Sequence, residues 1–372
     1  MDNNTKRTWA KISLENIKHN YYQIRKAIPQ NCKFLGVVKA NAYGHGAVEV
    51  AKTLESVGAD YLAVACLDEA IELRKNNIKL PILILGHTPS EYTDKLIEYN
   101  ICQCVANLNK AKEYSLEASK LNKNLKVHIK LDTGMSRLGF LCAGSYFENG
   151  IKNLVEACSL PNLSLEGIFT HFSVSDEFIN DDEEYTRNQY KLFNDVIDTL
   201  VSKGITFKIR HCANSGVVIN YPEFTMDMVR PGLLLYGYGD NGKLGLKPCM
   251  SVYTRVSTIK YVDPGVAISY GRHYLTDSRQ TIGVISMGYA DGLFRSLSNK
   301  CEFDFNGHKV KQVGNICMDM CMINITGLDD CDINSVIEIF GENNSLEELA
   351  SKGGTIPYEL MCSMSSRVKR IY

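Results

Sequence analysis

Short runs of apolar residues recur between residues 34 and 235, and longer, more polar stretches separate most of them. Ser13 and Pro29 delimit a first helix, and the stretches 47–57 and 190–201 also carry apolar residues at helical spacing. Parallel strands buried on both faces read as continuous apolar runs, so this rhythm predicts strands alternating with helices. Eight runs favour a (β/α)8 barrel of the TIM type, with an open doubly wound sheet as the competing architecture. The predicted strands are residues 34–38, 61–65, 82–85, 101–105, 125–131, 165–170, 206–210 and 228–235.

The pattern changes near Gly242. From Met250 onward apolar and polar residues alternate, β-forming residues are common, and glycine or Asp-Pro marks the turns. Alternation with a period of two is typical of half-buried strands, so we expect a mainly antiparallel β domain with one short helix at 346–350. The chain is thus expected to fold as a barrel domain, residues 1–242, and a C-terminal β domain, residues 243–372. The predicted strands of the second domain are residues 251–262, 280–287, 301–305, 309–313, 320–325 and 336–340.

Composition narrows the class of protein. The formal net charge of -1 argues against nucleic-acid binding, which needs a basic face. The 13 cysteines are scattered and form no CxxC pair, so we expect no metal site, but free thiols in a reducing cytoplasm. No apolar run approaches the ~20 residues of a membrane span, and the polar start does not resemble a signal peptide. We expect a cytoplasmic protein without membrane contact or, if the chain is a fragment, the cytoplasmic part of a membrane-bound enzyme.

Charged and polar residues stand where the predicted barrel strands end. Active sites of such barrels lie at the carboxyl ends of the strands, where these side chains would converge. A lysine directly after a buried strand is costly unless it is paired or used, although a single one is often a surface lysine. The residues at the strand ends are Lys39, Lys130, Asp132, Arg137, His171, His211 and Arg230.

The loops after the last two predicted strands suit an anion. They contain Asn214 and Ser215 in the first and Gly232 and Leu233 in the second. Barrels often bind phosphate there, because small residues let backbone N–H groups approach the anion and a nearby helix start adds positive potential. Ordinary helix capping is the alternative interpretation. Tyr43, four residues beyond Lys39, is placed to donate its hydroxyl to the same phosphate.

Seven motifs carry a family resemblance. In chain order they are VVKANAYGHG, KLDTGMSRLG, THF, HCANSG, MVRPGLLLYG, SMGYADG and GNICMDM. Together they resemble the alanine racemase family of fold-type III pyridoxal-phosphate (PLP) enzymes over nearly the whole chain. The resemblance implies a (β/α)8 barrel with a C-terminal β domain, a PLP cofactor, and a homodimer whose active sites are shared between subunits.

The resemblance also implies roles for individual residues. Lys39 would carry PLP and act as the base for the D-enantiomer, and Tyr289 would act on the L-enantiomer in the partner's site. Lys130 matches a lysine that is carbamylated in many members. The implied cofactor contacts are Lys39, Tyr43, Arg137, His171, Asn214, Ser215, Arg230, Gly232 and Leu233, and the implied substrate contacts are Arg137, Met318, Asp319 and Ser366.

Two positions depart from the family pattern. Ser366 stands where alanine racemases usually have a tyrosine, and Asn315 stands where they usually have an arginine in the access corridor. Both changes resemble the serine racemases of vancomycin-resistance operons. We therefore expect a racemase of alanine, serine or both that supplies D-amino acid for cell-wall precursors. The alternatives are a non-catalytic PLP-binding protein with the same barrel, which would lack the β domain, and a fold-type III decarboxylase, which would lack GYADG.

Overall fold

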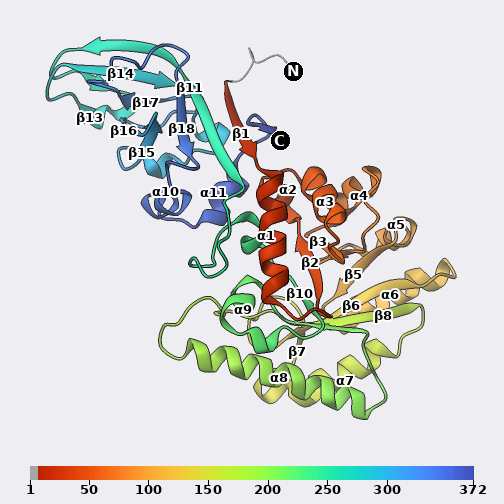
Figure 1. The fold of residues 1–372 in the computed structure, drawn as a ribbon. Coiled ribbons are helices and arrows are strands. Elements are labelled where there is room, and N and C mark those ends of the chain that lie inside the picture. Colours follow the sequence, from red (N-terminus) through yellow and green to blue (C-terminus); the bar gives the residue numbers. More distant parts are fainter. Residues whose placement is uncertain (1–6) are drawn as a thin grey trace. The chain divides into compact units, whose positions relative to one another are not determined.

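The computed structural model describes residues 7–372, which form two compact units (Figure 1). The barrel unit comprises Glu15–Ala42 and Ala47–Lys247. The β unit comprises residues 7–14 together with Tyr43–Gly46 and Pro248–Tyr372. The β unit thus gathers three separate stretches of sequence. The domain limits 1–242 and 243–372 stay a prediction, since no single cut in the chain separates the two compact units.

The strands of the barrel unit form one parallel sheet that is nearly closed. Along the sheet the order is β10-β2-β3-β4-β5-β6-β8-β9, so strands consecutive in sequence are neighbours and the last strand lies beside the first. Between β9 and β10, backbone hydrogen bonds run from Asp227 to Arg210 (3.1 Å) and from Arg230 to Ala213 (2.8 Å). A doubly wound sheet would reverse its strand order in the middle. The predicted barrel is therefore confirmed. Its strands are β2 (Lys33–Val37), β3 (Tyr61–Val64), β4 (Ile82–Ile84), β5 (Ile101–Val105), β6 (Leu125–Asp132), β8 (Leu163–Phe169), β9 (Ile209–His211) and β10 (Met228–Val229), with the short β7 (Phe140–Leu141) beside β6.

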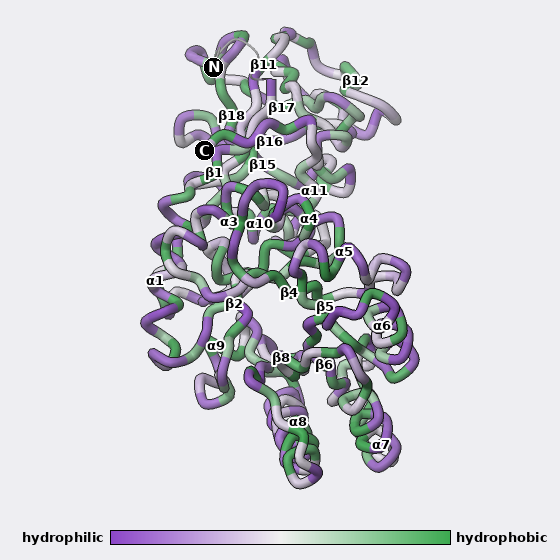
Figure 2. The backbone as a smooth tube through the Cα atoms, turned by 90° about the vertical axis from the view of Figure 1, so that its right-hand side faces the viewer, coloured by the Kyte–Doolittle hydropathy of each residue, from purple (hydrophilic) through white to green (hydrophobic). Residues whose placement is uncertain are grey.

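Helices surround this sheet. In Figure 2 the strands β2, β4, β5, β6 and β8 form a ring, and helices α1, α6, α7 and α8 lie outside it. Helix α8 begins earlier than the predicted stretch 190–201, because its acidic first turn, Asp182 to Glu184, suits the positive end of a helix. The helices are α1 (Leu14–Ala27), α3 (Ala47–Ser56), α4 (Leu67–Lys75), α5 (Thr93–Glu98), α6 (Leu108–Lys120), α7 (Phe147–Cys158), α8 (Asp182–Ser202) and α9 (Ser215–Asn220).

The eighth strand is much shorter than the predicted stretch 228–235. It ends at Val229, and after Pro231 and Gly232 the chain forms a 3-10 helix, η5 (Leu233–Tyr236). Proline cannot donate a ladder hydrogen bond, which is why the strand stops there. Leu234, Leu235 and Tyr236 of η5 are still buried, and the Tyr236 hydroxyl donates to the carbonyl of Val37 at 2.7 Å. The strand was predicted too long because a short apolar run looks the same in the sequence whether it forms a buried strand or a buried turn of helix.

The β unit is built on an eight-stranded sheet with the order β14-β17-β16-β15-β18-β11-β1-β19, and β14 also pairs with β11. Its pairs are antiparallel except β1 with β19, so the predicted β domain is confirmed. The predicted Asn306-Gly307 turn joins β15 to β16, and both residues have positive φ (51° and 87°), as a tight hairpin requires. The strands are β1 (Thr8–Ile12), β11 (Met250–Val262), β14 (Gln280–Ile285), β15 (Glu302–Phe305), β16 (His308–Val313), β17 (Cys321–Asn324), β18 (Val336–Phe340) and β19 (Lys369–Ile371), with a separate hairpin of β12 (Ala267–Ile268) and β13 (Tyr274–Leu275).

Two helices complete the β unit. Helix α10 (Leu346–Gly353) contains the predicted helix 346–350, whereas α11 (Pro357–Ser363) was not predicted. Strand β1 was not predicted either; it alternates buried and more exposed residues and pairs with β11. Within residues 7–372, no helix has the length and apolar character needed to cross a membrane.

Candidate active site

Lys39 follows β2 after one residue, Val38, and opens the short turn α2 (Lys39–Tyr43), whose backbone is left-handed. Ala40, Asn41 and Ala42 have φ between 52° and 54°. Left-handed backbone costs a residue with a Cβ roughly 1–2 kcal/mol, so such a run persists only where its surroundings hold it. Here the Glu69 carboxylate accepts the N–H groups of Ala40 (2.6 Å) and Ala65 (2.7 Å), which ties this turn to the end of β3. The position of Lys39 is thus fixed by a strained backbone.

Arg230, directly after β10, is buried and bonded on several sides. Its Nη1 lies 3.0 Å from His211 Nδ1, and its Nη2 lies 3.3 Å from His171 Nδ1. Nη2 also donates to the carbonyls of Thr170 (2.8 Å) and Cys212 (3.0 Å). A guanidinium only donates hydrogen bonds, so the Nδ1 atoms of both imidazoles must act as acceptors. Arg230 thereby sets the tautomer of His171 and of His211.

The chain of imidazoles continues into the barrel. His211 Nε2, which carries the proton, lies 2.8 Å from His128 Nδ1. Burial lowers the pKa of His211 well below its usual value, and the positive charge of Arg230 lowers it further. For His171 burial is again the largest cause, followed by the charges of Lys130 and Arg230, and Lys39 adds to the same effect. Both rings are therefore neutral near pH 7. Burial lowers the pKa of Arg230 to about 10, so it remains a cation beside them.

Lys130 and Arg137 belong to the same region of the barrel unit. Lys130 lies on β6 and is nearly fully buried, with its Nζ 4.5 Å from the centre of the Phe169 ring. Burial and the charge of Arg230 are the main causes that lower its pKa to about 7, and Arg137 contributes. Arg137 itself is exposed, on the loop after β6. Asp132 shapes that loop by accepting the N–H groups of Gly134 and Ser136, both at 3.0 Å.

The two loops expected to bind phosphate meet. The hydroxyl of Ser215, at the start of α9, accepts the N–H groups of Gly232 (3.0 Å) and Leu234 (3.4 Å). Asn214 caps α9 by accepting the N–H group of Val217 at 3.0 Å. A Cβ on Gly216 would lie 2.7 Å from the Ser175 hydroxyl, so only glycine fits there. The barrel unit thus brings together Lys39, Lys130, His171, Arg230 and the loops of Ser215 and Gly232.

The other candidate residues belong to the β unit. Tyr289, which is 44 % exposed, begins the 3-10 helix η7 (Tyr289–Asp291). The N–H groups of Tyr289 and Ala290 donate to the carbonyls of Cys317 and Met318, both at 3.0 Å. Tyr289, Met318 and Asp319 are therefore held on two bonded turns. Tyr43 also lies in the β unit, where its ring centre is 5.7 Å from that of Tyr358 and burial raises its pKa.

The two positions that depart from the family pattern differ in their surroundings. Ser366 is exposed, in a turn between α11 and β19. Asn315 is buried, and its Nδ2 donates to the carbonyl of Tyr270 at 2.7 Å. Asn315 thus holds a backbone segment in place, whereas Ser366 is exposed and holds no such contact in the hydrogen bonds of the described residues.

Two buried residues were not predicted from the sequence: His128, which is bonded to His211, and Asp291, which lies two positions after Tyr289. His128 lies on β6 two positions before Lys130. Residues two apart on a strand point to the same face, so this spacing could have indicated that His128 points inward with Lys130. The Nε2 of His128 is buried and has no hydrogen-bond partner among the described residues. Asp291 lies in the SMGYADG motif, but its partners are distant in sequence. Nothing local to the motif indicates what the carboxylate binds.

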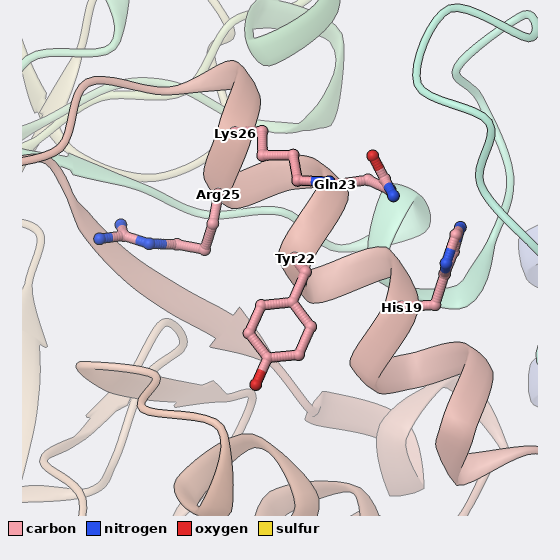
Figure 3. A pocket seen from close by; sticks show the side chains of 5 residues that line it. All are labelled: His19, Tyr22, Gln23, Arg25 and Lys26. Atoms are coloured by element: carbon pink, nitrogen blue, oxygen red, sulfur yellow. The ribbon is translucent and has the colours of Figure 1, made fainter.

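Helix α1 carries a separate surface hollow lined by His19, Tyr22, Gln23, Arg25 and Lys26 (Figure 3). The figure shows these side chains pointing in different directions around the helix. Arg25 donates to the Cys32 carbonyl at 2.6 Å, and His19 Nε2 lies 2.9 Å from the Gly245 carbonyl. A binding site needs converging polar groups, so this hollow is not the candidate site.

Comparison with known proteins assigns the family. The family described as alanine racemase, N-terminal domain, matches residues 12–240, and alanine racemase, C-terminal domain, matches residues 249–372. The chain belongs to the alanine racemase family. The alanine racemase of Desulforamulus reducens is 41% identical over 370 residues, which cover 98% of both chains.

Solved structures of alanine racemases agree with this fold. The alanine racemase of Clostridium difficile 630 has a TM-score of 0.92 at 39% identity, covering 98% of this chain and 95% of that one. The alanine racemase of Bartonella henselae, solved with covalently bound pyridoxal phosphate, has a TM-score of 0.86 at 29% identity, covering 98% and 99% of the two chains. The resemblance stated from the motifs is therefore confirmed.

Proposed function

We propose that this protein is a PLP-dependent racemase that interconverts L- and D-alanine and also accepts serine. The observation that carries the proposal is the cluster at the barrel strand ends, where Lys39, on a strained turn after β2, and His171, after β8, belong to the same barrel unit. Arg230 and the loops of Ser215 and Gly232 complete that cluster. Membership of the alanine racemase family supports the assignment of substrate.

The residues of the barrel unit fit PLP. Ser215, Asn214, Gly232 and Leu233 would hold the phosphate together with Tyr43, and Lys39 would bind the cofactor covalently. The hydrogen bonds of Arg230 within residues 7–372 use Nη1 and Nη2, so its Nε–H would be available to donate to the ring nitrogen of the cofactor. When bound, PLP supplies the electron sink that lets the α-proton leave. We propose that His171 and Arg137 lie beside the ring.

Two bases on opposite faces of the α-carbon are needed to invert it. We propose that Lys39 removes or returns the proton on the face of the D-enantiomer and that Tyr289 does so for the L-enantiomer. Arg230 keeps its own proton, because its pKa of about 10 lies above neutral pH. It therefore does not protonate an acceptor that it faces. His171, neutral for the same reasons of burial and charge, accepts from Arg230 and stays oriented.

The family resemblance supports the rest of the proposal. The protein would act as a homodimer, with Tyr289, Met318 and Asp319 reaching the partner's site. It would work in the cytoplasm and supply D-amino acid for cell-wall precursors.

The test is kcat/KM for alanine and for serine in both directions. We expect alanine to be racemised with equal kcat/KM from either enantiomer, because the two enantiomers have equal free energy in water. Release of CO2 without inversion would indicate the decarboxylase instead. Binding of PLP without turnover of either amino acid would indicate the non-catalytic protein.

The serine activity rests on Ser366, where a tyrosine would crowd the substrate's side chain. A serine hydroxyl left without a partner in an apolar pocket costs about 1–3 kcal/mol, and Ser366 or a water in the vacated volume removes much of that cost. Ser366→Tyr is expected to shift the ratio of the two kcat/KM values toward alanine by roughly tenfold, about 1.4 kcal/mol. Ser351→Tyr, on the exposed surface of α10, is the matched control. An unchanged ratio in Ser366→Tyr would mean that this position does not set specificity.

We also propose that Lys130 is carbamylated. Only a neutral amine attacks CO2, and burial lowers the pKa of Lys130 to about 7, so much of it is neutral at physiological pH. The amine nitrogen would bond to the carbon of CO2 and lose a proton to solvent, and the resulting anion would lie near Arg230 and Arg137. With ¹³C-labelled bicarbonate, we expect a carbamate resonance above pH 7 that disappears below about pH 6 as the amine becomes protonated.

Lys130→Ala should lack that resonance. Lys126→Ala is the control, because Lys126 lies on the same strand but reaches the surface, where its Nζ donates to Asn100 at 2.9 Å. A resonance retained in Lys130→Ala would assign the carbamate to another amine.

A further inference from the structure

Asp291 ends the η7 turn that begins at Tyr289, and its carboxylate is fully buried. Its Oδ1 and Oδ2 accept from Nη1 and Nη2 of Arg7, both at 2.9 Å. Arg367 Nε lies 3.4 Å from Oδ1, and Oδ2 also accepts the N–H of Gly288 at 2.9 Å. All these residues belong to the β unit. One buried carboxylate therefore connects three segments that are far apart in the sequence.

Stability alone does not explain a carboxylate buried here. A buried charge loses its hydration, and replacing a buried ion pair by apolar residues of similar volume is often neutral or stabilising. The Asp291 side chain is fully buried, whereas those of Arg7 and Arg367 are 37% and 43% exposed. A bidentate arginine–carboxylate pair, by contrast, fixes the relative position and orientation of the two side chains. The arrangement around Asp291 therefore indicates that the positions of the segments it connects must be fixed relative to one another.

The same two arginines reach the neighbouring turn. Arg7 Nη2 donates to the carbonyl of Asp319 at 2.6 Å, and Arg367 Nη2 donates to its carboxylate at 2.8 Å. This adds to the two backbone hydrogen bonds that join the Tyr289 turn to Cys317 and Met318. The segment of the proposed second base and the segment of the proposed substrate contacts are thus bound to one pair of cations.

The turn has little freedom to adjust. A Cβ on Gly288 would overlap the carbonyl oxygens of Cys317 and Met318. Gly292, directly after Asp291, has φ 114° and donates its N–H to the Tyr289 carbonyl at 3.2 Å. The Asp291 carboxylate is one of these restraints, because it also accepts the N–H of Gly288, so its loss would loosen the turn that carries Tyr289.

We propose that Asp291 is a positioning residue for racemisation: with Arg7 and Arg367 it fixes the turn of Tyr289 relative to Met318 and Asp319. The inference rests on the proposed function, in which Tyr289 is the base for the L-enantiomer. Displacing a reacting group by about 1 Å can cost roughly 100-fold in rate. Asp291→Asn keeps the shape of the side chain and removes the charge that both arginines bind, so we expect racemisation to fall by roughly 10- to 100-fold.

The decisive measurement separates the two bases. In ²H2O, Lys39 can take the α-proton of D-alanine and return a deuteron to the same face without help from Tyr289. We expect Asp291→Asn to raise the ratio of exchange with retention to inversion, as Tyr289→Phe should do more strongly. General loss of folded protein would lower both rates equally and leave that ratio unchanged.

A second readout does not depend on activity. Amide hydrogen exchange followed by mass spectrometry on the cofactor-free and loaded enzyme should show faster exchange in peptides covering residues 286–293 and 316–320 of Asp291→Asn. Peptides from the barrel strands should exchange as in the wild type. The control is Asp304→Asn, which also alters a buried carboxylate of the β unit that accepts a turn N–H, that of Gly307 at 3.0 Å.

Arg7→Gln is the second variant, for the case that Asp291→Asn does not fold. Arg7 is 37% exposed, and Arg367 remains to pair with Asp291, so we expect a folded enzyme with a smaller change in the same ratio. If the wild type racemises alanine but neither variant changes the ratio or the exchange of residues 286–293, Asp291 does not position Tyr289. If the wild type does not racemise alanine, the proposed function fails first.

Discussion

Lys39→Ala should abolish racemisation, with a loss of at least roughly 10⁴-fold. General acid–base catalysis alone contributes about 10²- to 10⁴-fold, and Lys39 is proposed to be both a base and the covalent anchor of the cofactor. The variant should also lose the absorbance of the covalently bound cofactor and any cofactor that borohydride fixes to the protein. PLP can still bind through its phosphate, because Ser215, Gly232 and Leu234 do not depend on Lys39.

Lys33→Ala provides the matched control. Lys33 lies at the other end of β2, half exposed, with Asp60 as a distant ion-pair partner at 3.9 Å. We expect its removal to leave racemisation and cofactor attachment unchanged. If Lys39→Ala still yielded a borohydride-fixed lysine adduct, another lysine of the barrel would have to be the anchor.

Mixing inactive Lys39→Ala with Tyr289→Phe protein should restore activity. Each variant alone is expected to lose roughly 10²-fold or more. In a mixed dimer, one site would combine Lys39 from one protomer with Tyr289 from the other, and the second site would lack both. With random exchange of subunits, half of the dimers are mixed and each has one intact site, so recovery should approach roughly a quarter of wild-type activity.

This experiment tests the dimer and the two-base scheme together. Subunit exchange is checked with protomers that carry different tags, and each variant is mixed with itself as the control. Exchange without recovery would mean that both bases of a site come from one chain. Recovery would assign Tyr289 to the partner's site even though Tyr289 is 44% exposed in the single chain.

The barrel could be predicted from the sequence because its strands are buried on both faces and are short. Ile82–Ile84 is apolar throughout, and Ile101–Val105 is apolar except for the buried Gln103. The same signal failed at Leu233–Tyr236, since a buried 3-10 helix is as apolar as a buried strand. Strand β1 escaped detection because only five residues form it and its partners are remote, as in the pairing of Ala10 with Val252.

The candidate site was predictable to the extent that its residues follow strands. Lys39, His171 and Arg230 each come directly after an apolar run, and the barrel topology brings such positions together. His128 and Asp291 could not be assigned a role in this way. The role of each depends on a hydrogen-bond partner that is distant in the sequence: His211 for His128, and Arg7 for Asp291.

The pairing of β1 also has a consequence for synthesis on the ribosome. Domains generally fold as units while the chain emerges, N-terminal segments first. Thr8–Ile12 leaves the ribosome before the barrel, but its two neighbours in the sheet, β11 and β19, follow the barrel in the sequence. The nascent chain must therefore keep β1 unpaired until the barrel residues have been translated. During that interval the backbone N–H and C=O groups of residues 8–12 lack their sheet partners. Chaperone binding to the nascent chain should therefore concentrate there.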